Sequence, residues 1–374
     1  MANMTTLRKI VLSLASQAVL REVSGAVIPP PTGKYNVSRK KVEIPYVNTG
    51  DPIAPNNVTT AFLATIYYPT SEGFTGPPVP YLDPALAALF EDAYNVTVGS
   101  FANLTTDAIV WDAPLLRGIA YPTLLFGPAG IGPPVEMFSI LLSDLASYGY
   151  TVIGADHPYE QPFIRWPNGT ALYGLPPFSS PDIDSGTLID IRVNETKALI
   201  DNLPLIEKSV RGLINSTHIG TFGHSAGGAA ALRALLRDDR VSSAISIDGP
   251  FLDQDQYTDA VEPVLLLSEE AYEDPSWVNF APLQTGWWKH LAVNGSLHVD
   301  FTDLAFWKEV TDVKAHSSSL GDINGYRQVN ITRTFTRDFF DFTLRGVPEP
   351  LFDGPSDAWP EVVYITVENS TLTN

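Results

Sequence analysis

The sequence lacks cysteine, long apolar runs and an excess of positive charge. Without cysteine it has no disulfides, which a chain of 374 residues does not need because it can bury a large core. Lys and Arg number 23 against 42 Asp and Glu, and the net charge of −19 argues against nucleic-acid partners and anionic membrane surfaces. No run of 18 apolar residues occurs, so no membrane-spanning helix is expected.

The composition is that of a globular chain with many loops. Hydrophobic residues make up 44% of the sequence and charged residues 17%, which does not fit a disordered chain. The 27 glycines and 31 prolines indicate long ordered connections. We therefore expect a large folded core with an extensive loop surface.

The N-terminus and the sequons point to secretion. Arg8 and Lys9 precede an apolar stretch over 10–20 and small residues near Gly25, so residues 1–26 are predicted to be a secretory signal peptide. We expect a secreted, extracellular glycoprotein; a cytosolic enzyme rich in Thr and Asn is the alternative. Ten Asn-x-Ser/Thr sequons follow, at Asn36, Asn57, Asn95, Asn103, Asn168, Asn194, Asn215, Asn294, Asn330 and Asn369.

Strand and helix patterns alternate along most of the chain. Strands are predicted over 42–46, 61–68, 123–126, 151–155, 219–222, 244–247, 264–267 and 291–293. Helices are predicted over 84–94, 135–148, 188–203 and 327–344, and one more is expected to begin at 226. This alternation predicts an α/β fold with a mostly parallel sheet and helices on both faces. Residues 27–374 are expected to form one domain with loop insertions at about 70–118 and 157–186.

A Gly-His-Ser-Ala-Gly-Gly segment, residues 223–228, follows a short apolar strand and precedes a helix-forming stretch. A Gly-x-Ser-x-Gly turn presents its serine at a strained corner between strand and helix, and this makes Ser225 the candidate nucleophile. Together with the alternation, the turn predicts the α/β-hydrolase fold. The alternative is an incidental serine at the start of a helix of small residues.

A serine nucleophile needs a base, and the chain has six histidines. His298 follows a late strand and precedes a helix, where the base of an α/β-hydrolase belongs. His224 is expected to point away from the site, and no motif surrounds the rest. The remaining candidates are His157, His218, His290 and His316.

The acid that orients the base should fall between Ser225 and His298 in the chain. Two positions qualify, Asp248 after one predicted strand and Glu269 or Glu270 after the next. The Gly249-Pro250 turn modestly favours Asp248, because it would fix a carboxylate at the end of a strand. For the oxyanion, the backbone N–H of Ala226 is the first expected donor, and the loop over 127–132 should supply the second.

Three segments resemble the platelet-activating-factor acetylhydrolase family of secreted serine esterases. They read F-G-H-S-A-G-G, I-S-I-D-G-P and N-G-S-L-H-V-D-F-T-D, and the resemblance extends over about 121–362. It implies that Asp248 is the acid and that Ile131 carries the second oxyanion donor. The family commonly has histidine where this chain has Ala129. Short or oxidised acyl esters, including phospholipid sn-2 acetyl groups, are the substrates that it implies.

Other functions remain open from the sequence. A broader lipase or polyester hydrolase would use the same motif, and a catalytically inactive glycoprotein on the same scaffold could bind ligands instead. No cofactor and no metal are expected, since the acidic residues Asp253, Asp255 and Asp259 lack the glutamate of a calcium loop and are read as hydrated surface. The expected partner is a small-molecule or lipid ester. Three tryptophans near His298 would either line an acyl pocket or pack in the core: Trp287, Trp288 and Trp307.

Overall fold

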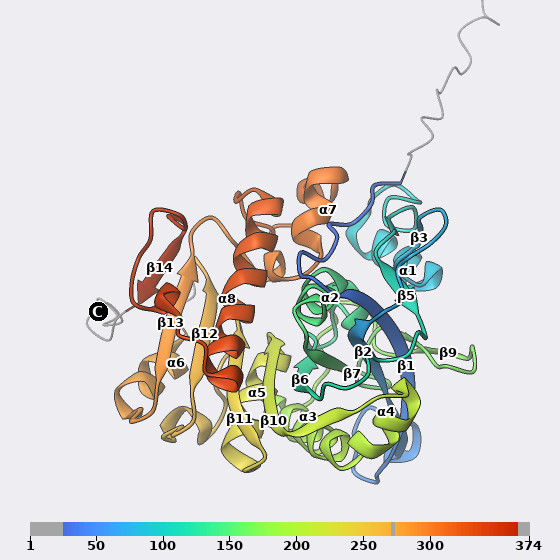
Figure 1. Cartoon of the computed structure of the whole chain (residues 1–374). Helices are drawn as coiled ribbons and strands as arrows, with labels where there is room; N and C mark the ends of the chain where they lie inside the picture. The colour runs from blue at the N-terminus through green and yellow to red at the C-terminus, as the bar shows by residue number, and fades with distance from the viewer. Residues whose placement is uncertain (1–24, 271–273, 366–374) are drawn as a thin grey trace, which may run out of the picture.

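A computed structural model describes residues 25–270 and 274–365 and contains a ten-stranded sheet (Figure 1). The strand order is β14-β13-β12-β11-β10-β6-β7-β2-β1-β5, and the run from β13 to β7 is parallel. This confirms the predicted α/β-hydrolase class. The strands of the sheet are β1 (Asn36–Asn48), β2 (Thr59–Thr70), β5 (Ile109–Trp111), β6 (Tyr121–Gly127), β7 (Thr151–Asp156), β10 (Ile214–His224), β11 (Val241–Ile247), β12 (Val264–Glu269), β13 (Trp288–Val293) and β14 (Val362–Ile365).

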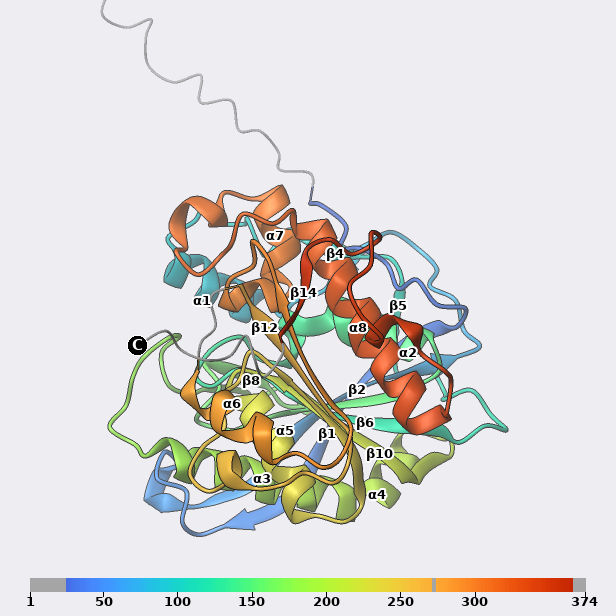
Figure 2. The same cartoon turned by 90° about the vertical axis from the view of Figure 1, so that its left-hand side faces the viewer.

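Helices cover both faces of the sheet, as Figure 2 shows. The long apolar runs of β6, β7, β11 and β12 are buried, because parallel strands covered on both sides have no solvent face. α2 and α8 pack on one face, and α3 to α6 pack on the other. The helices are α1 (Pro84–Tyr94), α2 (Ser139–Ser147), α3 (Ser185–Asp201), α4 (Leu203–Val210), α5 (Ala226–Arg237), α6 (Pro275–Phe280), α7 (Leu304–Val310) and α8 (Gly325–Arg345).

The segment over 70–118 forms more structure than expected. Its helix α1 is confirmed. Two further strands, β3 (Val79–Pro80) and β4 (Thr105–Thr106), pair with each other in a small antiparallel sheet. The segment then returns to the main sheet as β5, which pairs in parallel with β1 at its edge. α1 packs with α7 in a third apolar cluster, in which Phe101 and Trp307 are in ring contact. The segment over 157–186 contains a second hairpin, β8 (Phe163–Arg165) with β9 (Ala171–Tyr173).

Some predicted elements were wrong in extent or were missed. The helix expected over 135–148 is a 3-10 turn over Val135–Phe138 followed by α2, because the backbone of Met137 is not helical. The helix expected over 188–203 ends at Asp201, and α4 begins separately with Pro204 in its first turn, a place where proline is tolerated. The helix expected after His298 is present as α7, whereas β14 was not predicted. Within the described ranges, no helix has the length and apolar character needed to cross a bilayer.

Candidate active site

Ser225 lies at a sharp turn between β10 and α5. Its backbone has φ 58° and ψ −122°, an uncommon conformation for a residue with a side chain, and its N–H donates to Ile247 O at 2.8 Å. The flanking glycines are required by space: a Cβ on Gly223 would lie 2.3 Å from the backbone of Gly227, and one on Gly227 would lie 1.9 Å from Gly127 O. The turn that the motif predicted is therefore present.

His298 and Asp248 meet although they are 50 residues apart. His298 opens a 3-10 turn (His298–Phe301) just after β13, and its Nδ1–H donates to Asp248 Oδ2. Asp248 follows β11 with φ 53° and is 1% exposed, and its Oδ1 accepts the N–H of Glu269 at 2.9 Å. The carboxylate is thus held on both oxygens, in the position that fixes the imidazole tautomer.

The two alternative acids occupy other places. Glu269 contributes its backbone N–H to Asp248, and burial, reinforced by the charge of Asp248, raises the pKa of its own carboxyl group. Glu270 Oε2 accepts the N–H of Gly295 at 2.6 Å. The structure therefore pairs Asp248, and neither glutamate, with Nδ1 of His298.

His224 differs from the expectation that it points away from the site. Its Nε2–H donates to the backbone carbonyl of His298 at 2.8 Å, and the two rings lie 4.5 Å apart at 38°. Burial lowers the pKa of His224 well below its usual value, and His298 lowers it further. A neutral His224 therefore helps to hold the backbone of His298 in place through this hydrogen bond. Its position before the nucleophile on a buried strand gave no sign of this role.

Ser225 and His298 line one cavity of about 190 Å³. The opposite wall comes from distant segments, with Tyr94 at the end of α1 and Phe178 in the loop over 157–186. The two aromatic rings are 5.4 Å apart in an edge-to-face arrangement. Both segments expected to be insertions therefore reach the same cavity.

The loop over 127–132 lies against the start of α5. A Cβ on Gly130 would be 3.1 Å from the Cβ of Ala226, so the two backbones are close. Ala226 is the first residue of α5, and N–H groups in a first helical turn have no acceptor within their own helix. Ile131 has φ 48°, and its carbonyl accepts the N–H of Phe178 at 2.8 Å. The two expected oxyanion donors thus belong to neighbouring backbone segments.

Comparisons with known proteins agree with this geometry. The model of the family described as platelet-activating factor acetylhydrolase, isoform II, matches residues 187–341, a range that contains Ser225, Asp248 and His298. Over these residues the chain is similar to this family. The similar proteins include a probable 1-alkyl-2-acetylglycerophosphocholine esterase of Arthroderma benhamiae, which is 27% identical over 95% of this chain and 98% of its own length.

Two further matches come from a mammal and a bacterium. The platelet-activating factor acetylhydrolase of Canis lupus familiaris is 23% identical over 93% of this chain and 85% of the relative. The structure of a ferulic acid esterase from Streptomyces cinnamoneus superposes with a TM-score of 0.77 at 28% identity, covering 91% of this chain and all of the other. The chain is therefore a serine esterase with the α/β-hydrolase fold.

The tryptophans considered for an acyl pocket belong to the core of the protein. No tryptophan is among the described residues that line the cavity. Trp287 packs on Phe339 and Phe352, Trp288 lies against the second apolar cluster, and Trp307 is fully buried beneath α1. Tyr94 and Phe178 take the place that sequence proximity to His298 suggested for tryptophan.

The acidic residues after β11 are ion-paired and not simply hydrated. Arg233, fully buried in α5, binds Asp255 through Nε and Asp253 at 2.8 Å, and Asp255 is 6% exposed. Asp259 accepts the hydroxyl of Thr285 at 2.7 Å. The expectation of a hydrated surface was therefore wrong for Asp255.

One group of described side chains has the composition of a metal site. Ligand atoms of His224, Asp248 and His298 lie within 4.8 Å of one another. A metal would need these atoms free, but Nδ1 of His298 is bonded to Asp248 and Nε2 of His224 is bonded to the carbonyl of His298. The arrangement fits a hydrogen-bonded catalytic chain better than a metal centre.

Proposed function

We propose that this chain is a secreted carboxylic-ester hydrolase that forms an acyl-enzyme on Ser225. One observation carries the proposal: His298, bonded through Nδ1 to a buried Asp248, shares a cavity with a serine held in a strained turn. This is the arrangement in which a weak hydroxyl nucleophile has an oriented base beside it.

In the proposed reaction, Ser225 Oγ attacks the ester carbonyl while Nε2 of His298 takes the hydroxyl proton. The N–H groups of Ala226 and Ile131 stabilise the negative oxygen of the tetrahedral intermediate. The intermediate collapses when the carbon–oxygen bond to the leaving group breaks, and His298 gives its proton to the departing alcohol. Water, deprotonated by His298, then attacks the acyl carbon, the bond from that carbon to Ser225 Oγ breaks, and His298 returns the proton to Oγ. Asp248 keeps the imidazole in the required tautomer throughout.

The proposed substrates are short-chain acyl esters, including phospholipid sn-2 acyl esters. A cavity of about 190 Å³ lined by two aromatic rings suits a small acyl group better than a long chain. The names of the fungal and canine relatives point to the same class. Tyr94 and Phe178 would then meet the acyl group beyond its carbonyl carbon.

A second candidate is the hydrolysis of aromatic acid esters. The similar bacterial structure is a ferulic acid esterase. The cavity offers two aromatic rings, which would contact a phenyl ring in a stacked or edge-to-face arrangement. The two candidates share the chemistry at Ser225 and differ in the group that the opposite wall accepts.

Secretion is part of the proposal. Eight of the sequon asparagines within the described residues are exposed and Asn215 is half-buried, so glycans at the eight exposed sites would extend into solvent. Asn369 and nearly all of the expected signal peptide, residues 1–24, lie outside the described residues. Expression of the full sequence in a eukaryotic host should yield protein in the medium that loses mass on treatment with a peptide-N-glycosidase. Protein retained inside the cells without glycans would contradict this part.

The substrate class can be tested with a panel of p-nitrophenyl esters of increasing acyl length, together with methyl ferulate and a phospholipid with an sn-2 acetyl group. The proposal predicts the highest kcat/KM with acetyl to butyryl esters and a steep fall beyond them. Preference for methyl ferulate would favour the second candidate. Equal rates over all lengths would indicate a broader lipase, and no turnover of any ester would indicate an inactive scaffold.

A further inference from the structure

The loop that carries the second proposed oxyanion donor is held from behind by side chains outside the catalytic set. Arg192 projects from the middle of α3 and is 1% exposed. Its guanidinium donates from NH1 to Pro128 O at 2.6 Å and from NH2 to Ala129 O at 3.2 Å. Gln161, also 1% exposed, donates from Nε2 to Ala129 O at 3.0 Å. Two carbonyls of the loop therefore receive three hydrogen bonds.

The guanidinium is itself fixed in place. Glu160 accepts from Nε of Arg192 at 3.1 Å and from NH2 at 2.5 Å, and both side chains are buried. A bidentate pair of this kind fixes the plane of the guanidinium, so its remaining N–H groups point in set directions. Arg192 and Gln161, with Glu160 as their support, are called the loop clamp below.

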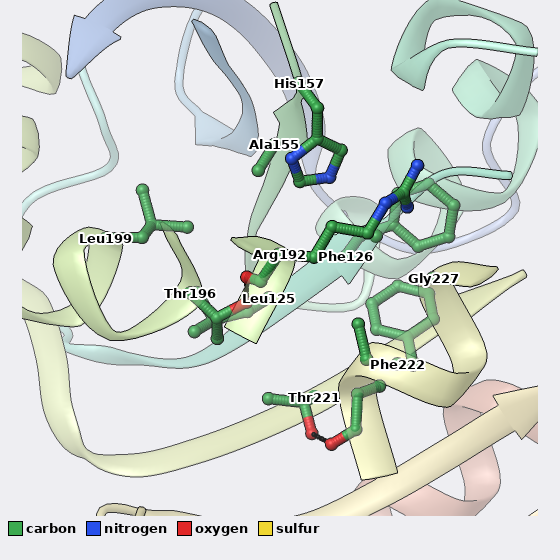
Figure 3. A pocket seen from close by; sticks show the side chains of 13 residues that line it. Leu125, Phe126, Ala155, His157, Arg192, Thr196, Leu199, Thr221, Phe222 and Gly227 are labelled. Atoms are coloured by element: carbon green, nitrogen blue, oxygen red, sulfur yellow. Dashed lines mark hydrogen bonds between the residues drawn. The ribbon is translucent and has the colours of Figure 1, made fainter. Parts of the chain in front are cut away.

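Arg192 of the loop clamp also lines a small cavity, shown in Figure 3. His157 lines the same cavity, and burial lowers its pKa to about 3, with the charge of Arg192 as the next cause. His157 is therefore uncharged at neutral pH and does not compete with Arg192 for Glu160. Arg192 remains the cation that acts on the loop carbonyls.

Ile131 needs such support. A β-branched residue at φ 48° is strained, and a strained conformation persists only where its surroundings determine it. The carbonyl of Ala129 is held on one side of the Ile131 N–H by Arg192 and Gln161, and the carbonyl of Ile131 is held on the other by Phe178 N–H. The peptide that bears the N–H of Ile131 lies between two fixed peptides.

We propose that Arg192 and Gln161 are positioning residues, which hold the 127–132 loop so that the N–H of Ile131 stays directed at the oxyanion. This inference rests on the proposed function of Ser225. Neither side chain lines the cavity that holds Ser225, so neither is expected to contact the substrate. The loop clamp should lower the energy of the transition state while leaving substrate binding almost unchanged.

The test uses the full chain with Gln161→Met and Arg192→Lys. Gln161→Met removes one hydrogen bond to the loop and also an Oε1 that has no partner among the described residues, so it should fold. Arg192→Lys keeps the charge but cannot serve Glu160 and two carbonyls together. We expect kcat to fall by about 10-fold and by about 10²-fold respectively, with KM within a factor of about 2.

A second readout separates positioning from general damage to the structure. A boronic acid that forms a tetrahedral adduct with the serine should lose affinity in parallel with kcat, because its oxygen occupies the oxyanion position. The control is Arg333→Lys: Arg333 is also buried and also donates to backbone carbonyls, but those of Ile140 and Pro29, which lie outside the loop. It should lower Tm without changing kcat.

Three results would overturn the inference: unchanged kcat in Gln161→Met and Arg192→Lys, a change confined to KM, or an equal loss of kcat in Arg333→Lys. If Arg192→Lys does not fold, Gln161→Met alone decides. An inactive wild type would overturn the proposed function and this inference together. An active wild type with unaffected loop-clamp variants would overturn the inference alone.

Discussion

The two walls of the cavity are built in different ways. One wall contains Ser225, at the carboxyl end of β10, and His298, just beyond β13, and His298 is bonded to Asp248 after β11. The other consists of Tyr94 and Phe178, which come from long connections between strands. The sheet thus positions the proposed catalytic residues, and the connections supply the surface that is proposed to select a substrate.

The walls also differ in what holds them. Backbone hydrogen bonds to neighbouring strands fix Ser225 to Ile247 and Asp248 to Leu267, both at 2.8 Å. The aromatic wall is held by ring contacts and by hydrogen bonds that include the one from Phe178 N–H to Ile131 O. Substitutions on the first wall should therefore abolish turnover, and substitutions on the second should change which ester is turned over.

The largest expected effect is at the strand wall. Ser225→Ala removes the nucleophile, so kcat should fall by about 10⁶-fold while Tm stays near that of the wild type. Stopped-flow release of p-nitrophenol should show an acylation burst in the wild type and none in the variant. A burst that survives in Ser225→Ala would place the nucleophile elsewhere.

The next effect concerns the acid. Asp248→Asn keeps the size of the side chain but favours the wrong imidazole tautomer, so kcat should fall by about 10⁴-fold. Glu269→Gln is the matched control, because Glu269 reaches Asp248 through its backbone N–H, which the substitution retains. It should cost less than about 10-fold. If Glu269→Gln proves the more damaging change, the acid is Glu269.

A smaller effect, of a different kind, is expected at the aromatic wall. Phe178→Ala opens the cavity, so the ratio of kcat/KM for octanoyl over acetyl esters should rise by about 10-fold while acetyl turnover changes little. Tyr173→Ala is the control, since Tyr173 is an exposed aromatic residue of the same connection that does not line the cavity. An unchanged ratio in Phe178→Ala would show that this wall does not select the acyl group.

The smallest effect on activity is expected at Asp303, a buried residue at the N-terminus of α7 that does not line the cavity. Burial raises its pKa to about 8, so the folded protein holds a proton that the unfolded chain releases above about pH 4. The free energy of unfolding should therefore fall as pH rises from about 4 to about 8. Asp303→Asn should flatten this dependence, measured as Tm at pH 5 and pH 8. Asp322→Asn, at an exposed site, should leave the slope unchanged, and an equal slope in Asp303→Asn would contradict the assignment.

Sequence reasoning succeeded where a local pattern determines structure. The glycines around Ser225 are required by contacts within a few residues and with one neighbouring strand, so the turn could be predicted. The choice of Asp248 as the acid and of Ile131 as the second oxyanion donor depended on the family resemblance. Spacing alone left two positions for the acid and did not say which residue of the loop carries the donor. Tyr94 and Phe178 could not be found, since 84 residues separate them and their meeting depends on how two irregular connections fold. His224 was misjudged because its partner is the backbone of a residue 74 positions away.

The most direct test of the account is covalent labelling of the folded chain with a fluorophosphonate, followed by mass-spectrometric mapping of the labelled peptide. The account predicts one adduct per chain, on Ser225, absent from Ser225→Ala and formed far more slowly in His298→Ala. Because the reagent needs an activated serine and no particular acyl pocket, the result does not depend on the aromatic wall. An adduct on another residue, or no adduct on an active wild type, would contradict the central claim.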